Sequence, residues 1–190
     1  MRLRRTAPHH TTPHRTAPHH TGPHHTWTVG LALIVLVSLP RMSNLNFVLN
    51  LVSTWYMVGL IWMVQIVHYA MFDRVGSQGF ATYEADHSRL ITPIVGVPML
   101  IELATAAMLI AWPPAGMSRG VAVAGLVMVG LIWLSTAAIQ IPYHNQLAAG
   151  FDPAAHRGLV NTNWIRTVLW SARGALMGWV LWRMLTPPTA

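Results

Sequence analysis

The chain has 190 residues, of which 53% are apolar and only 9% are charged. A soluble globular domain carries about 25% charged residues, so this composition argues against a water-soluble enzyme. The net charge is +7, every basic residue is an arginine, and the absence of cysteine excludes disulfides and thiolate chemistry.

The N-terminal region is repetitive. Residues 6–25 form four Pro-His pentapeptides that hold seven of the eleven histidines. Because no apolar residue there is larger than alanine, we expect a disordered tail over residues 1–26. Its imidazoles suit zinc, nickel or copper; the alternatives are a tail without a role and a translation start at Met42. The apolar stretch over residues 27–41 is short for a span of about 20 residues and stays unassigned.

Four longer apolar segments follow, at about residues 45–72, 93–112, 120–141 and 163–185. Each is long enough to cross a bilayer as a helix. The sequence therefore predicts an all-α fold, a polytopic four-transmembrane-helix bundle over residues 42–190. The links at Asp73–Thr92 and Pro142–Thr162 are about 20 residues each, and in a four-span protein both emerge on one side of the membrane.

Polar residues cluster near these two links, which predicts a polar pocket at one mouth of the bundle. The candidate catalytic residues are His68, Glu84, His87, His144 and Arg166, and the candidate substrate-binding residues are Gln65, Tyr69, Gln140, Asn145, Asn163 and Trp170. Helical spacing places Gln65 with His68, and Gln140 with His144, on shared faces.

An ion pair is predicted at mid-membrane depth. Glu102 lies nine residues after Pro93, and Arg173 lies ten residues after Asn163. With both helices starting from the same face and rising about 1.5 Å per residue, these opposite charges reach similar depth. We expect Glu102 and Arg173 to pair; the alternative is a protonated Glu102 bonded to a hydroxyl such as that of Thr136.

The mouth has two chemical interpretations. In the first it needs no cofactor: a histidine or Glu84 abstracts a weakly acidic proton, and Arg166 with Asn163 stabilises the resulting oxyanion. Trp62, Met99, Trp133 and Trp170 would surround a lipophilic substrate. In the second, a single transition metal is held by His68, His87, His144 and Glu84, or a haem is held between His68 and another histidine. A di-metal site lacks the second Glu-x-x-His pair that it needs.

Two short stretches resemble a known family. Ile141-Pro142-Tyr143-His144-Asn145-Gln146-Leu147 and Asn163-Trp164-Ile165-Arg166-Thr167 are similar to the end of the third helix and the start of the fourth in the anthrone-oxygenase-like family of small four-helix membrane proteins. Asn163, Arg166 and Thr167 match its N-x-x-R-T pattern, whereas His144 stands where asparagine is usual. The resemblance covers about residues 50–185.

The resemblance implies a multi-pass protein of a bacterial plasma membrane that oxidises a polycyclic anthrone with O2, without metal or flavin. His68, His87 or Glu84 would then be the base, and Arg166 would stabilise the enolate. The alternative is a non-catalytic membrane subunit whose polar mouth docks a membrane-protein partner or a second copy in a homo-oligomer. Dispersed arginines give no support to a nucleic-acid partner. The arginines of the tail favour cytoplasmic termini and an outward-facing mouth.

Overall fold

The computed structural model describes the backbone of residues 24–186 and the side chains of residues 41–186. Most of the predicted tail, residues 1–23, lies outside the described residues. The chain divides into two compact units, residues 1–37 and 38–190, and the fold below is that of the second. Helix α1 (His24–Met63) begins inside the predicted tail, and the unassigned residues 27–41 are helical.

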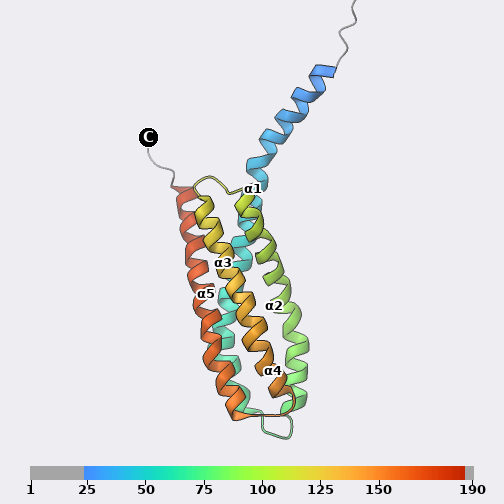
Figure 1. Cartoon of the computed structure of the whole chain (residues 1–190), viewed down its shortest axis with the longest axis vertical. Helices are drawn as coiled ribbons and strands as arrows, with labels where there is room; N and C mark the ends of the chain where they lie inside the picture. The colour runs from blue at the N-terminus through green and yellow to red at the C-terminus, as the bar shows by residue number, and fades with distance from the viewer. Residues whose placement is uncertain (1–23, 187–190) are drawn as a thin grey trace, which may run out of the picture. The chain divides into compact units, whose positions relative to one another are not determined.

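All elements of the described residues are helical, which confirms the predicted all-α class. After α1 come a π-helical turn η1 (Val64–His68), a 3-10 turn η2 (Tyr69–Arg74), α2 (Phe80–Ala111), α3 (Arg119–Ser135), a second π-helical turn η3 (Thr136–Gln140), α4 (Ile141–Ala148) and α5 (Pro153–Leu185). From residue 41 onward, these elements form four helical stretches: α1 with η1 and η2, α2, α3 with η3 and α4, and α5. Figure 1 shows the stretches side by side.

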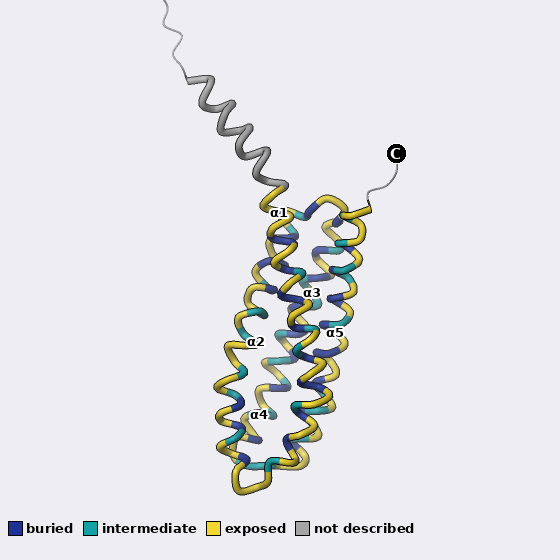
Figure 2. The backbone as a smooth tube through the Cα atoms, turned by 180° about the vertical axis from the view of Figure 1, so that it is seen from behind, coloured by how far each residue is buried: buried dark blue, intermediate teal, exposed yellow. Residues whose placement is uncertain are grey.

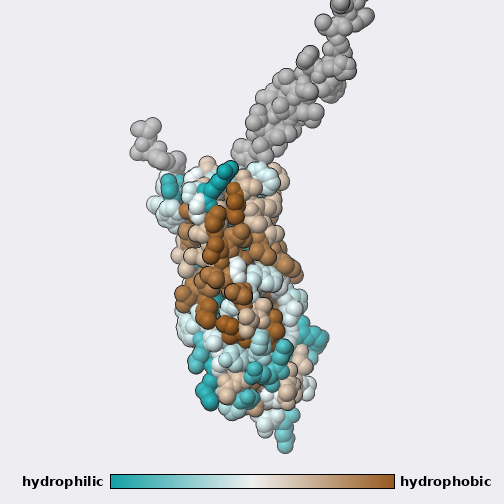
Figure 3. Space-filling model, viewed as in Figure 1, coloured by the Kyte–Doolittle hydropathy of each residue, from teal (hydrophilic) through white to brown (hydrophobic). Residues whose placement is uncertain are grey.

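Three of these stretches are long and apolar enough to span a membrane: Arg41–Arg74, Phe80–Ala111 and Arg119–Ala148. Helix α5 is not among them, because polar residues such as Asn163, Arg166 and Arg173 interrupt its apolar sequence. The described residues are thus compatible with an integral membrane protein. Figure 3 shows hydrophobic side chains gathered over the middle of the helices and hydrophilic ones toward the end that carries α4.

The predicted links of about 20 residues are wrong. Helix α2 begins at Phe80, before Pro93, and α5 begins at Pro153, so the connections shrink to residues 75–79 and 149–152. Proline costs a helix one backbone hydrogen bond, but packed neighbouring helices allow it within membrane segments. Pro93 and Pro98 both lie inside α2. Pro142 likewise does not end the third stretch, because it follows the wide π turn η3 and sits in the first turn of α4.

The two short connections nevertheless lie at the same end of the helices, as predicted. The rings of Phe80 and Phe151, one beside each connection, are 5.0 Å apart in an edge-to-face contact. The connection between α2 and α3 lies at the opposite end (Figure 1). Asp152 caps α5 by accepting a hydrogen bond from the backbone N–H of Ala154 over 2.8 Å. This end of the helices therefore brings together the residues beside both connections.

Buried residues recur among exposed ones along the whole length of the helices (Figure 2). One apolar cluster, which includes Met57, Phe72 and Met99, lies toward the end with the polar residues. A second, which includes Phe47, Leu109 and Met177, lies toward the other end. The polar stripe of α5 predicted to face inward does so: Asn163, Arg166, Trp170 and Arg173 are all buried.

Candidate functional site

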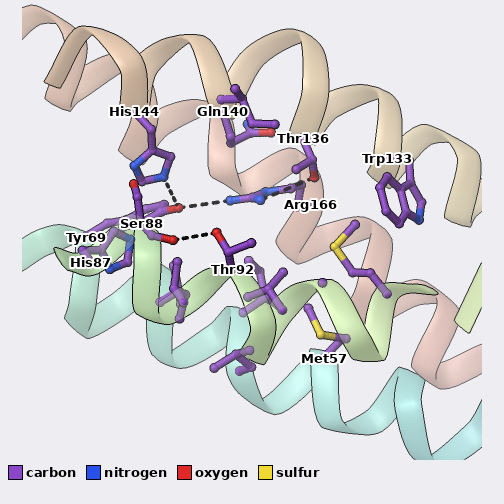
Figure 4. A pocket seen from close by; sticks show the side chains of 18 of the residues that line it. Met57, Tyr69, His87, Ser88, Thr92, Trp133, Thr136, Gln140, His144 and Arg166 are labelled. Atoms are coloured by element: carbon purple, nitrogen blue, oxygen red, sulfur yellow. Dashed lines mark hydrogen bonds between the residues drawn. The ribbon is translucent and has the colours of Figure 1, made fainter. Parts of the chain in front are cut away.

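A cavity of about 400 Å³ lies inside the first apolar cluster. Most of its wall is apolar, formed by residues that include Met57, Ile61, Val95 and Met99. Its polar wall comprises Tyr69, His87, Ser88, Thr92, Thr136, Gln140, His144, Asn145 and Arg166 (Figure 4). A cavity of this kind, apolar with a few convergent polar groups, is typical of small-molecule sites.

A chain of hydrogen bonds runs from Glu84, behind the polar wall, through His144 and Tyr69 to Arg166. His144 Nδ1 lies 2.6 Å from Glu84 Oε1, and its Nε2 lies 2.8 Å from the Tyr69 hydroxyl. Arg166 Nη2 donates to that hydroxyl over 3.3 Å. In the neutral tautomer of His144 that donates its Nδ1–H to Glu84, Nε2 accepts a hydrogen bond from Tyr69. Figure 4 shows Tyr69 and Arg166 joined in this way at the cavity wall. Tyr69 therefore lies between a base and a cation.

This chain suits acid–base chemistry. When a proton passes from Tyr69 to His144, the new negative charge lies beside Arg166 and the new positive charge lies beside Glu84. Each new charge thus gains an opposite neighbour, which stabilises the transferred state. Glu84 is fully buried and accepts a 3.2 Å hydrogen bond from Ser88. Both Tyr69 and His144 line the cavity.

The side-chain amides of Asn163 and Gln65 position the guanidinium of Arg166. Its Nε donates to Asn163 Oδ1 over 2.9 Å, and its Nη2 donates to the same oxygen. Asn163 Nδ2 in turn donates to Gln65 Oε1 over 2.8 Å. Asn163 and Gln65, predicted to bind substrate, are not on the cavity wall. They orient the guanidinium, which lines the cavity. Its other described hydrogen-bond partners, Tyr69 and Thr136, are also neutral side chains.

The four histidines that follow the tail meet at this end of the helices. His68 Nε2 and His87 Nδ1 are 2.8 Å apart, and the rings of His87 and His144 stack with centroids 5.4 Å apart. His156 Nε2 lies 2.7 Å from the backbone oxygen of Tyr69, to which it donates. The gathering that the sequence predicted is therefore present.

In the structure, the imidazoles of the alternative metal site bond to one another and to neighbouring side chains. His68 and His87 bond to each other, and both ring nitrogens of His144 are engaged by Glu84 and Tyr69. In the part of the chain that the structure describes, no three His, Cys, Asp or Glu side chains are arranged to hold a metal ion. Glu84 and His87 are about one turn apart on α2, but they bond different residues: Glu84 bonds His144, whereas His87 bonds His68.

The two π turns shape the site, which the sequence did not indicate. Val64 of η1 and Thr136 and Gln140 of η3 all line the cavity. A π turn holds more residues than an α turn and is frequent at functional sites. It also explains why Gln65 and His68 do not share a face as predicted: Gln65 points to α5, whereas His68 points to α2.

Beyond the cavity lies a second buried polar cluster, centred on Glu102 and Arg173. Arg173 Nε donates to Glu102 Oε1 over 2.7 Å, and both side chains are 1% exposed. The predicted ion pair is therefore present. Thr54 donates to the same oxygen over 2.7 Å, and Trp170, which lines the cavity, donates to Glu102 Oε2 over 3.0 Å. The hydroxyl of Thr136 bonds Arg166 and not Glu102.

The structure places the remaining predicted residues as follows. Gln140, Asn145 and Trp170 line the cavity with Tyr69, whereas Glu84 lies behind His144. Trp62, expected near the substrate, is instead 42% exposed. Sequence reasoning missed Ser88 and Thr136 and gave Tyr69 no chemical role. The position of Tyr69 beside His68, at the end of a predicted helix, was the one indication available.

Comparison of the chain with known protein families, with characterised proteins and with solved structures finds no match. The function is therefore argued from the geometry of the site.

Proposed function

We propose that the chain is an integral membrane protein of four spanning helices whose cavity binds a small lipophilic substrate and removes a proton from it. Three candidate spans support the membrane placement. Arg166 and Arg173 of α5 are buried among the other helices, which is the usual condition for charged residues inside a membrane. The observation that carries the chemistry is the chain Glu84–His144–Tyr69–Arg166 on the cavity wall.

In this mechanism Tyr69 and His144 act as the base. Glu84 holds the imidazole in the tautomer that accepts the proton of Tyr69, and the phenolic oxygen takes a proton from the substrate. Arg166, whose partners are neutral, stabilises the oxygen that becomes negative on an enolisable substrate. The apolar remainder of the wall accommodates a fused-ring or similar lipophilic body.

The resemblance to the anthrone-oxygenase-like family supplies a candidate overall reaction. Anthrone and O2 give anthraquinone and water: the methylene carbon loses two hydrogens and gains one oxygen atom of O2, and the second oxygen atom leaves as water. Deprotonation to the enolate is the step assigned to Tyr69 and His144. This reaction uses the chain's side chains and O2, and a haem absorption band or a stoichiometric metal in purified protein that lacks residues 1–41 would contradict it.

The activity is tested on protein purified in mild detergent with anthrone and 18O2, against a protein-free control for spontaneous oxidation. Tyr69→Phe is expected to lower turnover about 100-fold or more, as loss of a general base does. Tyr143→Phe is the matched control, because this tyrosine lies outside the cavity lining. Equal turnover in both variants, or none in the native chain, would overturn the proposal.

The four-span arrangement is tested by cysteine labelling, since the chain has no cysteine of its own. Ser77→Cys and Ala149→Cys, in the two connections at one end, are expected to react from one side of the membrane. Thr186→Cys, just after α5, is expected to react from the other side. Reaction of Thr186→Cys from the same side as Ala149→Cys would show that α5 does not span.

A further inference from the structure

A second hollow lies on the outer surface between η1 and α2, next to the cavity. This groove has a volume of about 300 Å³ and a predominantly apolar lining. Met63 and His68 form one edge, and Leu90, Ile91 and Ile94 belong to the other. Met63, Leu90 and Ile94 are 47%, 57% and 45% exposed, so the groove is open to the surroundings of the helices.

The groove and the cavity share a wall. His87 and Ile91 line both hollows, whereas His68 lines only the groove. Both η1 and α2 are described in full, and no Cα atom of η1 lies within 8 Å of a Cα atom of α2. The backbones therefore stand apart here, and side chains close the space between them. The 2.8 Å hydrogen bond between His68 and His87 bridges the two elements.

Both edges of the groove have irregular helical hydrogen bonding. His68 is the last residue of the π turn η1. In α2, Pro93 has no N–H to donate to the carbonyl of Arg89, and Pro98 has none for Ile94. Missing hydrogen bonds and π turns are the places where helices bend. Leu90 and Ile91, on the α2 edge of the groove, therefore lie in the turn that lacks the hydrogen bond to the Arg89 carbonyl.

We propose that the groove is a lateral binding site for an uncharged lipophilic molecule, which passes from the bilayer into the cavity when His87 turns away from His68. The site rests on the membrane placement of α1 and α2 in the proposed function. His87 lies seven residues from the start of α2, about 10 Å along the helix, which is within the candidate span. Tyr83 and Asp86 line the end of the groove nearer the start of α2, whereas Leu90, Ile91 and Ile94 continue its apolar lining toward the middle of the span. Its continuity with the cavity identifies the occupant as the cavity's own ligand.

The experiment uses a small uncharged lipophilic diazirine as a photolabel, with the full chain in lipid nanodiscs. In the native chain, labelled positions are expected both in the groove, at Leu90 or Ile94, and in the cavity, at Met99 or Trp133. A chain labelled in the cavity but never in the groove would overturn the proposal.

A block of the groove makes the test decisive. Leu90→Cys, alkylated with a bulky maleimide, is expected to lose cavity labelling, and Ile94→Cys serves as a second variant at the same groove. Val97→Cys, alkylated in the same way, is the matched control, because it lies on α2, is 54% exposed and lines neither hollow. Cavity labelling that persists in both blocked groove variants would refute lateral access.

This readout is separate from catalysis. A chain that admits the label through the groove but does not turn over anthrone contradicts the proposed reaction and leaves the lateral site standing. A chain that turns over anthrone equally well with a blocked and an open groove contradicts the lateral site alone.

Discussion

Removal of the carboxylate of Glu102 is the perturbation for which the structure predicts the largest effect. Glu102 is 1% exposed and accepts hydrogen bonds from Thr54, Trp170 and Arg173. Glu102→Gln keeps the shape of the side chain but leaves Arg173 as a buried cation without a counter-charge. Breaking a buried pair from one side costs about 3–5 kcal/mol of the free energy of unfolding.

The double variant Glu102→Met, Arg173→Met separates charge from packing. With both charges gone, no uncompensated ion remains, and apolar replacement of a buried pair is often close to neutral. We therefore expect the double variant to be more stable than Glu102→Gln alone. The measurement is denaturant unfolding in detergent followed by circular dichroism. Additive effects of Glu102→Met and Arg173→Met, or a loss below about 1 kcal/mol for Glu102→Gln, would refute the reasoning.

Three further predictions concern packing and capping, and the same unfolding measurement checks them. Gly125→Ala places a methyl group 2.8 Å from the buried guanidinium and is expected to cost about 1–3 kcal/mol, whereas Gly130→Ala on the same helix meets nothing within 4 Å and is expected to be neutral or stabilising. Gly158→Ala clashes with the ring of Tyr143 and is expected to destabilise the contact between α4 and α5; an unchanged stability would show that this ring moves freely. Asp152→Ala removes the cap of α5 and is expected to cost about 1 kcal/mol, with Asp152→Asn as the control that keeps a capping oxygen.

The ion pair shows why part of the fold was predictable. Both helix starts were placed too late, at Pro93 and Asn163. In the structure Glu102 lies 22 residues after Phe80 and Arg173 lies 20 residues after Pro153, so the two errors nearly cancel. The prediction depends only on how the depth of Glu102 along α2 compares with the depth of Arg173 along α5. An error of similar size in both helix starts leaves that comparison unchanged.

The candidate site was less predictable because it depends on local backbone irregularity. The sequence indicated which polar residues gather at one end, and four of them, His144, Tyr69, Glu84 and Arg166, form one chain of hydrogen bonds. It did not indicate which of them face the cavity. That depends on the two π turns, which form through tertiary packing and leave no clear periodicity in the residues that adopt them.

The pairing of Glu102 with Arg173 has a consequence for biogenesis. Helix α2 is synthesised well before α5, so Glu102 is present in the growing chain before Arg173. Until then Glu102 lacks the partner that it has in the folded chain. The pairing joins an early helix to the last one, and it can form only after α5 has been synthesised.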